Sequence, residues 1–439
     1  MPPAKAAATE DASGLAARRA ALDVIDAALA RRGGLDEAVG APALANLDNR
    51  DRAFARALAM TVLRRLGAID RILDARLRKP PPDAVRALLR LGAAQLLYME
   101  TPGHAAVDAT VELAGQRQAT RPFKALVNAV LRGLSRGGVP EVPPEAFAPD
   151  WLFARWRSAY GEAAAQAIAA HAAEEPAVDL TPRDPAEAPA IAASLDGEVL
   201  EGGSVRTRRH GDLAGWPGYG EGQWWVQDAS AAVAARLLGV GPGDTALDLC
   251  AAPGGKTLQL AAAGARVTAL DRSAPRLERL SENLARMRLE AEVVVAEAAG
   301  WSDPRLFDAV LLDAPCTATG TFRRHPEVLW SARPPEIAKL AMVQARLLLA
   351  AAERVRPGGH LVYCVCSLEP EEGEAQIETF LRVRPEFRLD PPAPGEGGAP
   401  SASLTAAGTL RILPVHRPGG TDGFFIARLV RLPPPPDAA

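Results

Sequence analysis

A chain of 439 residues, 48% of them hydrophobic, can bury two or three cores, so we expect several domains rather than one compact unit. No charged segment followed by an apolar core opens the chain, and no run of about 18 apolar residues interrupts it, so we expect neither a secretory leader nor a membrane span and predict a cytoplasmic location. The four cysteines, Cys250, Cys316, Cys364 and Cys366, form no CxxC pair and predict free thiols without a metal site.

The net charge of −3 conceals an asymmetry between the two ends of the chain. Residues 15–137 carry 20 Lys and Arg against 12 Asp and Glu, a net charge of +8, whereas residues 138–439 sum to −10. A local excess of Arg is what a protein needs to bind a phosphate backbone, but solvated helix faces give the same count. Charge alone therefore leaves nucleic-acid binding and an ordinary helical surface equally open.

The front of the chain is predicted to be helical. Residues 1–14 are rich in Ala and predict a disordered lead-in. Apolar residues at helical spacing then predict helices over 15–29, 50–77, 83–99, 105–114 and 122–134. No strand-like alternation occurs before Gly138, so residues 15–137 are predicted to form an all-α domain.

Residues 138–222 are predicted to be a linker followed by a small α+β subdomain, with a helix over 151–173. Arg206, Arg208, Arg209 and His210 form a small basic cluster there, for which a solvated loop is favoured over an RNA contact. Trp224 and Trp225 follow, and we expect them to pack in a core rather than to stack on a base.

From residue 223 to residue 432, strands and helices alternate. The predicted strands cover 245–250, 266–270, 291–295, 308–313 and 359–364, and the predicted helices cover 256–263, 273–287 and 335–354. This alternation is typical of an α/β fold, with a doubly wound, mostly parallel sheet and helices on both faces. A flexible excursion over 392–403, a closing hairpin over 411–413 and 423–430, and a tail over 433–439 complete the prediction.

A Gly-rich turn follows the first of these strands, in the stretch Asp248-Leu249-Cys250-Ala251-Ala252-Pro253-Gly254-Gly255-Lys256-Thr257. A phosphate-binding loop of the NTPase type would need Gly where Cys250 stands. The alternative is the first turn of a doubly wound sheet, which predicts an acidic residue about 20 positions on to hold a ribose. Asp271 stands there and Glu297 follows the third strand, so the turn predicts an adenosine-containing cofactor.

Two further strands end beside thiols, in Asp313-Ala314-Pro315-Cys316 and in Cys364-Val365-Cys366. Carboxyl ends of neighbouring parallel strands meet in one crevice, so Cys316 and Cys366 are expected to face one ligand, whereas Cys250 and Cys364 are expected in the core. A thiolate that attacks carbon 6 of cytosine makes carbon 5 able to accept a methyl group, and Asp313 could support the ring nitrogen or the exocyclic amine. Residue types alone do not say which thiol attacks.

These motifs, with Arg323-Arg324-His325-Pro326 and Pro370-Glu371-Glu372, resemble the Nop/Sun family of RNA cytosine-5 methyltransferases. The front half resembles the RNA-binding domain of the antitermination factor NusB, most clearly in Lys124-Ala125-Leu126-Val127-Asn128-Ala129-Val130-Leu131-Arg132. The combination implies an S-adenosylmethionine-dependent methyltransferase domain, of the class I Rossmann-like type, that acts on small-subunit (16S) ribosomal RNA.

The resemblance also implies residue roles. Cys366 would be the nucleophile, Cys316 would release the product, and Asp313 would lie between cofactor and base. The implied contacts of S-adenosylmethionine are Cys250, Ala251, Ala252, Pro253, Gly254, Gly255, Lys256, Asp271, Glu297 and Asp313. This sequence departs from the family pattern at Val365, Glu297 and Thr317, where Thr, Asp and Ser are common, and Glu297 is the contact that this puts most in doubt.

As partners we expect ribosomal RNA before full subunit assembly, no DNA and no membrane, and we expect a monomer. Three alternatives stay open: methylation of another RNA such as tRNA, a non-catalytic RNA-binding scaffold, and a DNA cytosine-5 enzyme. The last would need a base-reading domain, but only about 70 residues follow Cys366.

Overall fold

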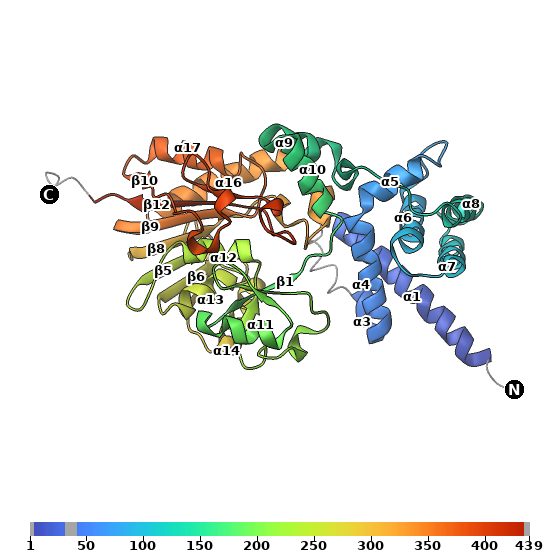
Figure 1. Cartoon of the computed structure of the whole chain (residues 1–439), viewed down its shortest axis with the longest axis horizontal. Helices are drawn as coiled ribbons and strands as arrows, with labels where there is room; N and C mark the ends of the chain where they lie inside the picture. Colours follow the sequence, from blue (N-terminus) through green and yellow to red (C-terminus); the bar gives the residue numbers. More distant parts are fainter. Residues whose placement is uncertain (1–3, 31–41, 434–439) are drawn as a thin grey trace. The chain divides into compact units, whose positions relative to one another are not determined.

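A computed structural model of the chain describes residues 4–30 and 42–433, which divide into two compact units (Figure 1). The first unit contains the chain up to Glu174 together with Phe322–Ser331, and the second contains Glu175–Thr321 together with the chain from Ala332 onward. The first unit thus runs past residue 137, where the sequence predicts the helical domain to end. The predicted tail over 433–439 lies, from residue 434 on, outside the described residues.

The first unit is helical throughout its described residues. Its longer helices are α1 (Ala4–Leu29), α4 (Asn49–Arg64), α5 (Leu66–Asp74), α6 (Asp83–Tyr98), α7 (Gly103–Gln116), α8 (Lys124–Ser135), α9 (Asp150–Tyr160) and α10 (Glu162–His171), and α3 (Pro42–Ala45) is a single turn. The helix predicted over 50–77 is broken at Arg65, where ψ turns to 19°. Helix α1 begins inside the stretch predicted to be disordered, because its Ala-rich sequence has high helix propensity.

A segment from the second half of the sequence belongs to the first unit. Residues Phe322–Ser331 include the short helix α15 (Glu327–Ser331), although the sequence predicts them within the methyltransferase domain of 223–432. The Phe322 ring packs on the Trp156 ring with centroids 5.8 Å apart, and Trp330 Nε1 donates to the Leu63 carbonyl at 3.2 Å. The burial of Phe322 and Trp156 and the partial burial of Trp330 explain why the segment, with its Arg323–Pro326 motif, packs among the helices.

The second unit begins with a small antiparallel sheet and helix α11 (Ala188–Ser194). The strands β1 (Val178–Pro182), β2 (Glu198–Val199), β3 (Val205–Thr207) and β4 (Trp224–Val226) lie in the order β2-β3-β1-β4. Trp224 and Trp225 are buried, as predicted; Trp224 packs in the core of this sheet and Trp225 packs against helices of the larger sheet.

The second unit continues with an eight-stranded sheet in the order β10-β12-β9-β8-β5-β6-β7, with β11 paired to β12. Its strands are β5 (Thr245–Leu249), β6 (Arg266–Asp271), β7 (Glu292–Val295), β8 (Phe307–Asp313), β9 (Val355–Val365), β10 (Phe387–Leu389), β11 (Leu410–Ile412) and β12 (Phe424–Arg431). Strands β5 to β9 are parallel, and β12 pairs antiparallel with β9 and β11, which confirms the predicted sheet and its closing hairpin.

Helices cover both faces of this sheet (Figure 1). One face packs against α12 (Ala229–Arg236), α13 (Gly255–Ala262) and α14 (Ala274–Met287). The other packs against α16 (Pro334–Ala352) and against α17 (Glu374–Val383), a helix absent from the prediction. Successive strand residues alternate between the faces, so Val365 packs toward α16 and α17 while Cys364 and Cys366 pack toward α12.

Two sequence predictions for this unit are wrong. The stretch 392–403 is not a flexible excursion, because it forms short 3₁₀ turns in which Ala399 and Ser403 are buried. The basic cluster is not a solvated loop throughout, because Arg206 lies in β3 and is buried. Its guanidinium forms a bidentate pair with the buried Asp179 of β1, at 2.7 and 2.8 Å. Arg208, Arg209 and His210 are exposed, as predicted.

Replacing Arg206 with Ala is expected to lower the free energy of unfolding by roughly 3 to 5 kcal/mol, because it leaves the Asp179 carboxylate buried without its cation. Asp179 also accepts a hydrogen bond from the Ala229 amide at the start of α12, so the loss extends to the attachment of that helix. Urea unfolding followed by circular dichroism measures the change. Arg208→Ala, an exposed neighbour in the same cluster, should stay within about 0.5 kcal/mol of wild type. Equal urea-unfolding midpoints for Arg206→Ala and Arg208→Ala would contradict a structural role for Arg206.

Candidate active site at the carboxyl edge of the sheet

The residues singled out by the sequence lie at or just after the carboxyl ends of the parallel strands. Cys250 follows β5, Asp271 ends β6, Asp313 ends β8, and Cys366 follows β9. These strands are neighbours in the sheet, in the order β6-β5-β8-β9. After β5 the chain adds β6 and β7 on one side of that strand, and then β8 and β9 on its other side, so the strand order switches between β5 and β8. This edge is where open α/β sheets bind their ligands.

The Gly-rich turn between β5 and α13 has the geometry of a ligand-binding loop. Gly254 adopts a φ of +112°, and a Cβ added there would lie 2.2 Å from Leu280 Cδ1, so only glycine fits. The first N–H groups of α13 have no acceptor within the helix and point toward the edge. Asp271 supports the turn, since its Oδ2 accepts a hydrogen bond from the Ala252 amide at 3.2 Å. A turn with these groups is suited to bind an adenosine-containing cofactor.

An ion pair connects this turn to the end of β8. Lys256 Nζ lies 2.7 Å from Asp313 Oδ2, and the ammonium group also lies over the Phe424 ring, 5.4 Å from its centroid. Burial by itself lowers the pKa of Lys256, but the Asp313 carboxylate outweighs that effect and the net change is upward. Lys256 therefore stays charged, and the other carboxylate oxygen of Asp313, Oδ1, lies 3.5 Å from Cys364 Sγ.

Asp248 is a fully buried carboxyl near the end of β5, two residues before Cys250. Its Oδ2 accepts a hydrogen bond from the Thr257 hydroxyl at 2.6 Å, while its Oδ1 has no hydrogen-bond partner among the described residues. Burial raises the pKa of Asp248 to about 7, against the opposing effect of Thr257 and Lys256. Asp248 is therefore partly protonated near neutral pH.

Two of the four thiols meet at this edge. Cys316 and Cys366 have their Sγ atoms 3.5 Å apart, and both are free and partly exposed. That separation is far longer than the roughly 2.05 Å of a disulfide bond, so both sulfurs can react. The structure brings these two predicted site residues together.

The other two thiols are unsuited to attack. Burial, with help from the Asp313 carboxylate, raises the pKa of Cys250 to about 12 and raises the pKa of Cys364 well above its usual range. A thiol is nucleophilic only as the thiolate, so both are inert at neutral pH. Cys364 is buried in the core, as expected, whereas Cys250 is only partly buried.

Glu297 and Glu372 are two further acids near this edge. Glu297, two residues beyond β7, is exposed, and its charge is one of those that raise the pKa of Cys250. Glu372, which the sequence shows only as part of a motif, is fully buried and accepts hydrogen bonds from Thr317, the residue after Cys316. The run Glu369-Pro370-Glu371-Glu372 contains three acids, and spacing alone does not say that Glu369 and Glu372 are buried while Glu371 is exposed.

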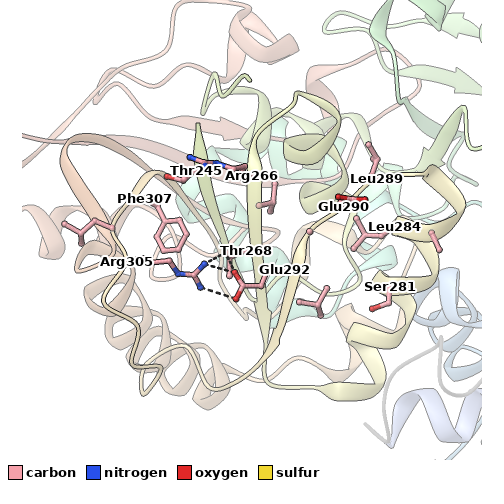
Figure 2. A pocket seen from close by; sticks show the side chains of 15 residues that line it. Thr245, Arg266, Thr268, Ser281, Leu284, Leu289, Glu290, Glu292, Arg305 and Phe307 are labelled. Carbon is pink, nitrogen blue, oxygen red and sulfur yellow. Dashed lines mark hydrogen bonds and ion pairs between the residues drawn. The ribbon is translucent and has the colours of Figure 1, made fainter. Parts of the chain in front are cut away.

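A hollow of about 990 Å³ lies at the opposite edge of the same sheet (Figure 2). Thr245, Arg266 and Phe307, the first residues of β5, β6 and β8, line it. Two of its charged groups are paired with each other, since Arg305 contacts Glu292 at 2.6 Å, and Thr268 donates to Glu292 at 2.9 Å. None of the predicted site residues lines it, so it is separate from the candidate active site.

Over residues 4–30 and 42–433, no helix has both the length and the apolar character needed to cross a membrane. In the same part of the chain, no three His, Cys, Asp or Glu side chains gather closely enough to hold a metal ion.

Asp248→Asn is expected to flatten the pH dependence of stability. A carboxyl whose pKa is raised by folding, here from about 4 to about 7, contributes stability below pH 4 that is lost as the pH rises through 7. At about 1.4 kcal/mol for each tenfold change in proton affinity, wild type should lose roughly 2 to 3 kcal/mol relative to the variant between pH 5 and pH 8. Urea unfolding at the two pH values measures the difference.

Asp308→Asn is the matched control, because Asp308 also accepts a hydrogen bond from a threonine hydroxyl, that of Thr245, at 2.6 Å. Hydrogen bonds from Thr245 lower the pKa of Asp308 to about 2, so it is ionised in both the folded and the unfolded chain above pH 5. The stability difference between Asp308→Asn and wild type should therefore be the same at pH 5 and pH 8. If the stability difference between Asp248→Asn and wild type were also the same at pH 5 and pH 8, Asp248 would already be ionised in the folded protein at pH 5, and the prediction would be wrong.

Comparison with known proteins agrees with this geometry. Residues 235–430 match the family described as 16S rRNA methyltransferase RsmB/F, and residues 15–136 match the NusB family. The protein is similar to crystal structures of PH0851, with a TM-score of 0.75 and 25% identity over 94% of this chain and 98% of that one, and of a methyltransferase homolog from Pyrococcus horikoshii, with a TM-score of 0.54 and 27% identity over 65% and 96%.

Two relatives are each called ribosomal RNA small subunit methyltransferase B. The one from Xanthomonas campestris pv. campestris is 38% identical over 97% of this chain and 99% of its own, and the one from Sodalis glossinidius is 36% identical over 89% and 92%. Identity at this level extends through both the helical half and the methyltransferase half. The chain belongs to the 16S rRNA methyltransferase RsmB/F family of S-adenosylmethionine-dependent RNA cytosine-5 methyltransferases.

Proposed function

We propose that this protein transfers a methyl group from S-adenosylmethionine to carbon 5 of a cytosine in small-subunit (16S) ribosomal RNA. The observation that carries the proposal is the pair of free thiols, Cys316 and Cys366, 3.5 Å apart at the ligand-binding edge of the sheet. The Lys256–Asp313 ion pair lies at the same edge, at the end of the neighbouring strand.

The proposed cofactor contacts are the turn from Cys250 to Lys256, Asp271 and Glu297. Free N–H groups at the start of α13, the missing side chain at Gly254 and the carboxylate of Asp271 suit a nucleoside with a flexible amino-acid chain. When bound, the cofactor supplies an electrophilic methyl group on a sulfonium. Asp313, as a carboxylate near that positive charge, is proposed to lie between the cofactor and the target base.

The proposed reaction uses Cys366 as nucleophile. Its thiolate forms a bond to carbon 6 of cytosine, and the electrons of the 5,6 double bond become available at carbon 5, which bonds to the methyl group. Asp313 is proposed to hold the proton at the ring nitrogen or to bind the exocyclic amine while the ring carries the extra charge. Cys316 then takes the proton from carbon 5, the bond between sulfur and carbon 6 breaks, and Cys366 leaves as a thiolate.

This chemistry needs access to both faces of a cytosine, so the base must leave any stack or pair before attack. We therefore propose ribosomal RNA that is not yet fully assembled as the substrate, bound with the help of the basic, NusB-like front half. We also propose that the protein acts as a monomer. Four free cysteines fit a reducing compartment, and we propose the cytoplasm.

Cys366→Ala is expected to abolish covalent trapping of 16S ribosomal RNA that carries 5-fluorocytosine. Fluorine at carbon 5 cannot leave as a proton does, so wild type should remain bonded to the RNA and move as a slow band on a denaturing gel. Cys364→Ala removes a neighbouring buried thiol and should trap as well as wild type. Trapping by Cys366→Ala at the wild-type level would refute the nucleophile, and equal trapping on tRNA would refute the choice of substrate.

Cys316→Ala is expected to accumulate a covalent complex with ordinary RNA in the presence of S-adenosylmethionine, because the methylated base cannot be released. The complex should be visible on a denaturing gel without any fluorinated base. The double variant Cys316→Ala/Cys366→Ala should show no complex, since the attacking sulfur is gone. A Cys316→Ala protein that turns over at the wild-type rate would rule out the release role.

A further inference from the structure

Glu372 is a buried carboxylate that the proposed reaction does not use. It lies in the loop between the end of β9 at Val365 and the start of α17 at Glu374. Its Oε1 accepts hydrogen bonds from the Thr317 amide and from Gln344 Nε2, each at 3.0 Å, and its Oε2 accepts one from the Thr317 hydroxyl. These donors are neutral, and together they fix the carboxylate in place inside the protein.

The same contacts hold the backbone on both sides of Cys316. Thr317, directly after the cysteine, gives its amide to Glu372. Gln344 of α16 donates both to Glu372 and to the carbonyl oxygen of Pro315, directly before the cysteine, at 2.9 Å. Glu372 and Gln344 therefore fix the position of the Cys316 side chain relative to Cys366.

The titratable and charged groups around Cys316 are Cys366, Glu372, Tyr363 and the cation Arg411, which donates to the Ser367 carbonyl and pairs with Glu374. Contact with Cys366, burial and the charge of Glu372 all raise the pKa of Cys316, against a backbone hydrogen bond from Ala318 that lowers it. Tyr363 faces the same region, and burial raises the pKa of its phenol, so it is neutral as well. Two thiols 3.5 Å apart cannot both ionise, because the second charge would be repelled by the first.

We propose that Glu372 is a positioning residue that selects the nucleophile: it keeps Cys316 as a neutral thiol and thereby leaves the thiolate to Cys366. The proposal rests on the proposed function for the role of Cys366 in methylation. The order in which the two thiols ionise, however, is a property of the protein without RNA or cofactor, so it can be tested alone.

The preference for a Cys366 thiolate over a Cys316 thiolate ends once Cys366 has reacted, which is the step at which Cys316 is needed as a base. Once Cys366 is bonded to carbon 6 it carries no charge, so its repulsion of a Cys316 thiolate is gone. Cys316 then ionises more easily at the stage when a base is needed for the proton at carbon 5. Glu372 thus delays ionisation of Cys316 until the nucleophile has been used.

The test is alkylation of the full chain by iodoacetamide, with the modified fraction of each cysteine measured by mass spectrometry from pH 6 to pH 10. Wild type should label Cys366 ahead of Cys316. Glu372→Gln keeps the size and a hydrogen-bonding oxygen but removes the charge, so the ratio of Cys316 to Cys366 labelling at pH 7 should rise on the order of tenfold. In a Cys366→Ser background, the same change should move the labelling midpoint of Cys316 to lower pH.

Glu371→Gln removes a charge from the neighbouring, exposed position and should leave the labelling ratio unchanged. Glu372→Asp keeps the charge and should retain the preference for Cys366, which a purely steric role would not predict. Preferential labelling of Cys316 in wild type, which needs no variant to fold, would overturn the proposal. So would an unchanged ratio in a Glu372→Gln protein with a wild-type circular dichroism spectrum. Because no RNA is present, correct thiol selection combined with absent RNA methylation would instead count against the proposed function.

Discussion

The ion pair between the buried Lys256 and the partly exposed Asp313 holds the candidate site together, because it joins the helix after the Gly-rich turn to the end of the neighbouring strand β8. Removing the Asp313 carboxylate would leave the Lys256 ammonium buried without this counter-ion, and burying an unpaired charge costs far more than a pair gains. The pair therefore fixes the position of the proposed cofactor turn relative to the strand that leads to Cys316. It also places a carboxylate beside Cys364, where it helps to keep that thiol protonated.

Three carboxyl groups near this edge illustrate how environment sets function. Asp313 pairs with the Lys256 ammonium at 2.7 Å. Asp248 has a hydroxyl donor and no cation in direct contact, so burial raises its pKa to about 7. Glu372 is held by the neutral donors of Thr317 and Gln344. Identical chemical groups thus supply a counter-ion, a partly protonated structural acid and a charge that acts on a neighbouring thiol.

The sequence could predict where the site lies but not how its members interact. Apolar runs that end in Cys250, Asp271 and Asp313 identify parallel strands, and parallel strands place such residues on one edge. Which side chains pair across that edge depends on contacts between distant residues, and neither spacing nor composition encodes them. For the same reason the sequence missed the burial of Arg206 against Asp179 and the packing of 322–331 among the helices of the first unit.

The choice between the two reactive cysteines shows this limit most clearly. Both follow strand ends, both are partly exposed, and residue type gives no order between them. Chemistry nevertheless requires an asymmetry, because a pair of equal thiols 3.5 Å apart would share one negative charge and each would attack only part of the time. A fixed negative charge close to one of the two thiols removes that ambiguity, and the group that carries the charge need not contact the substrate. Glu372, bonded to the residue after Cys316, supplies such a charge from the interior of the protein.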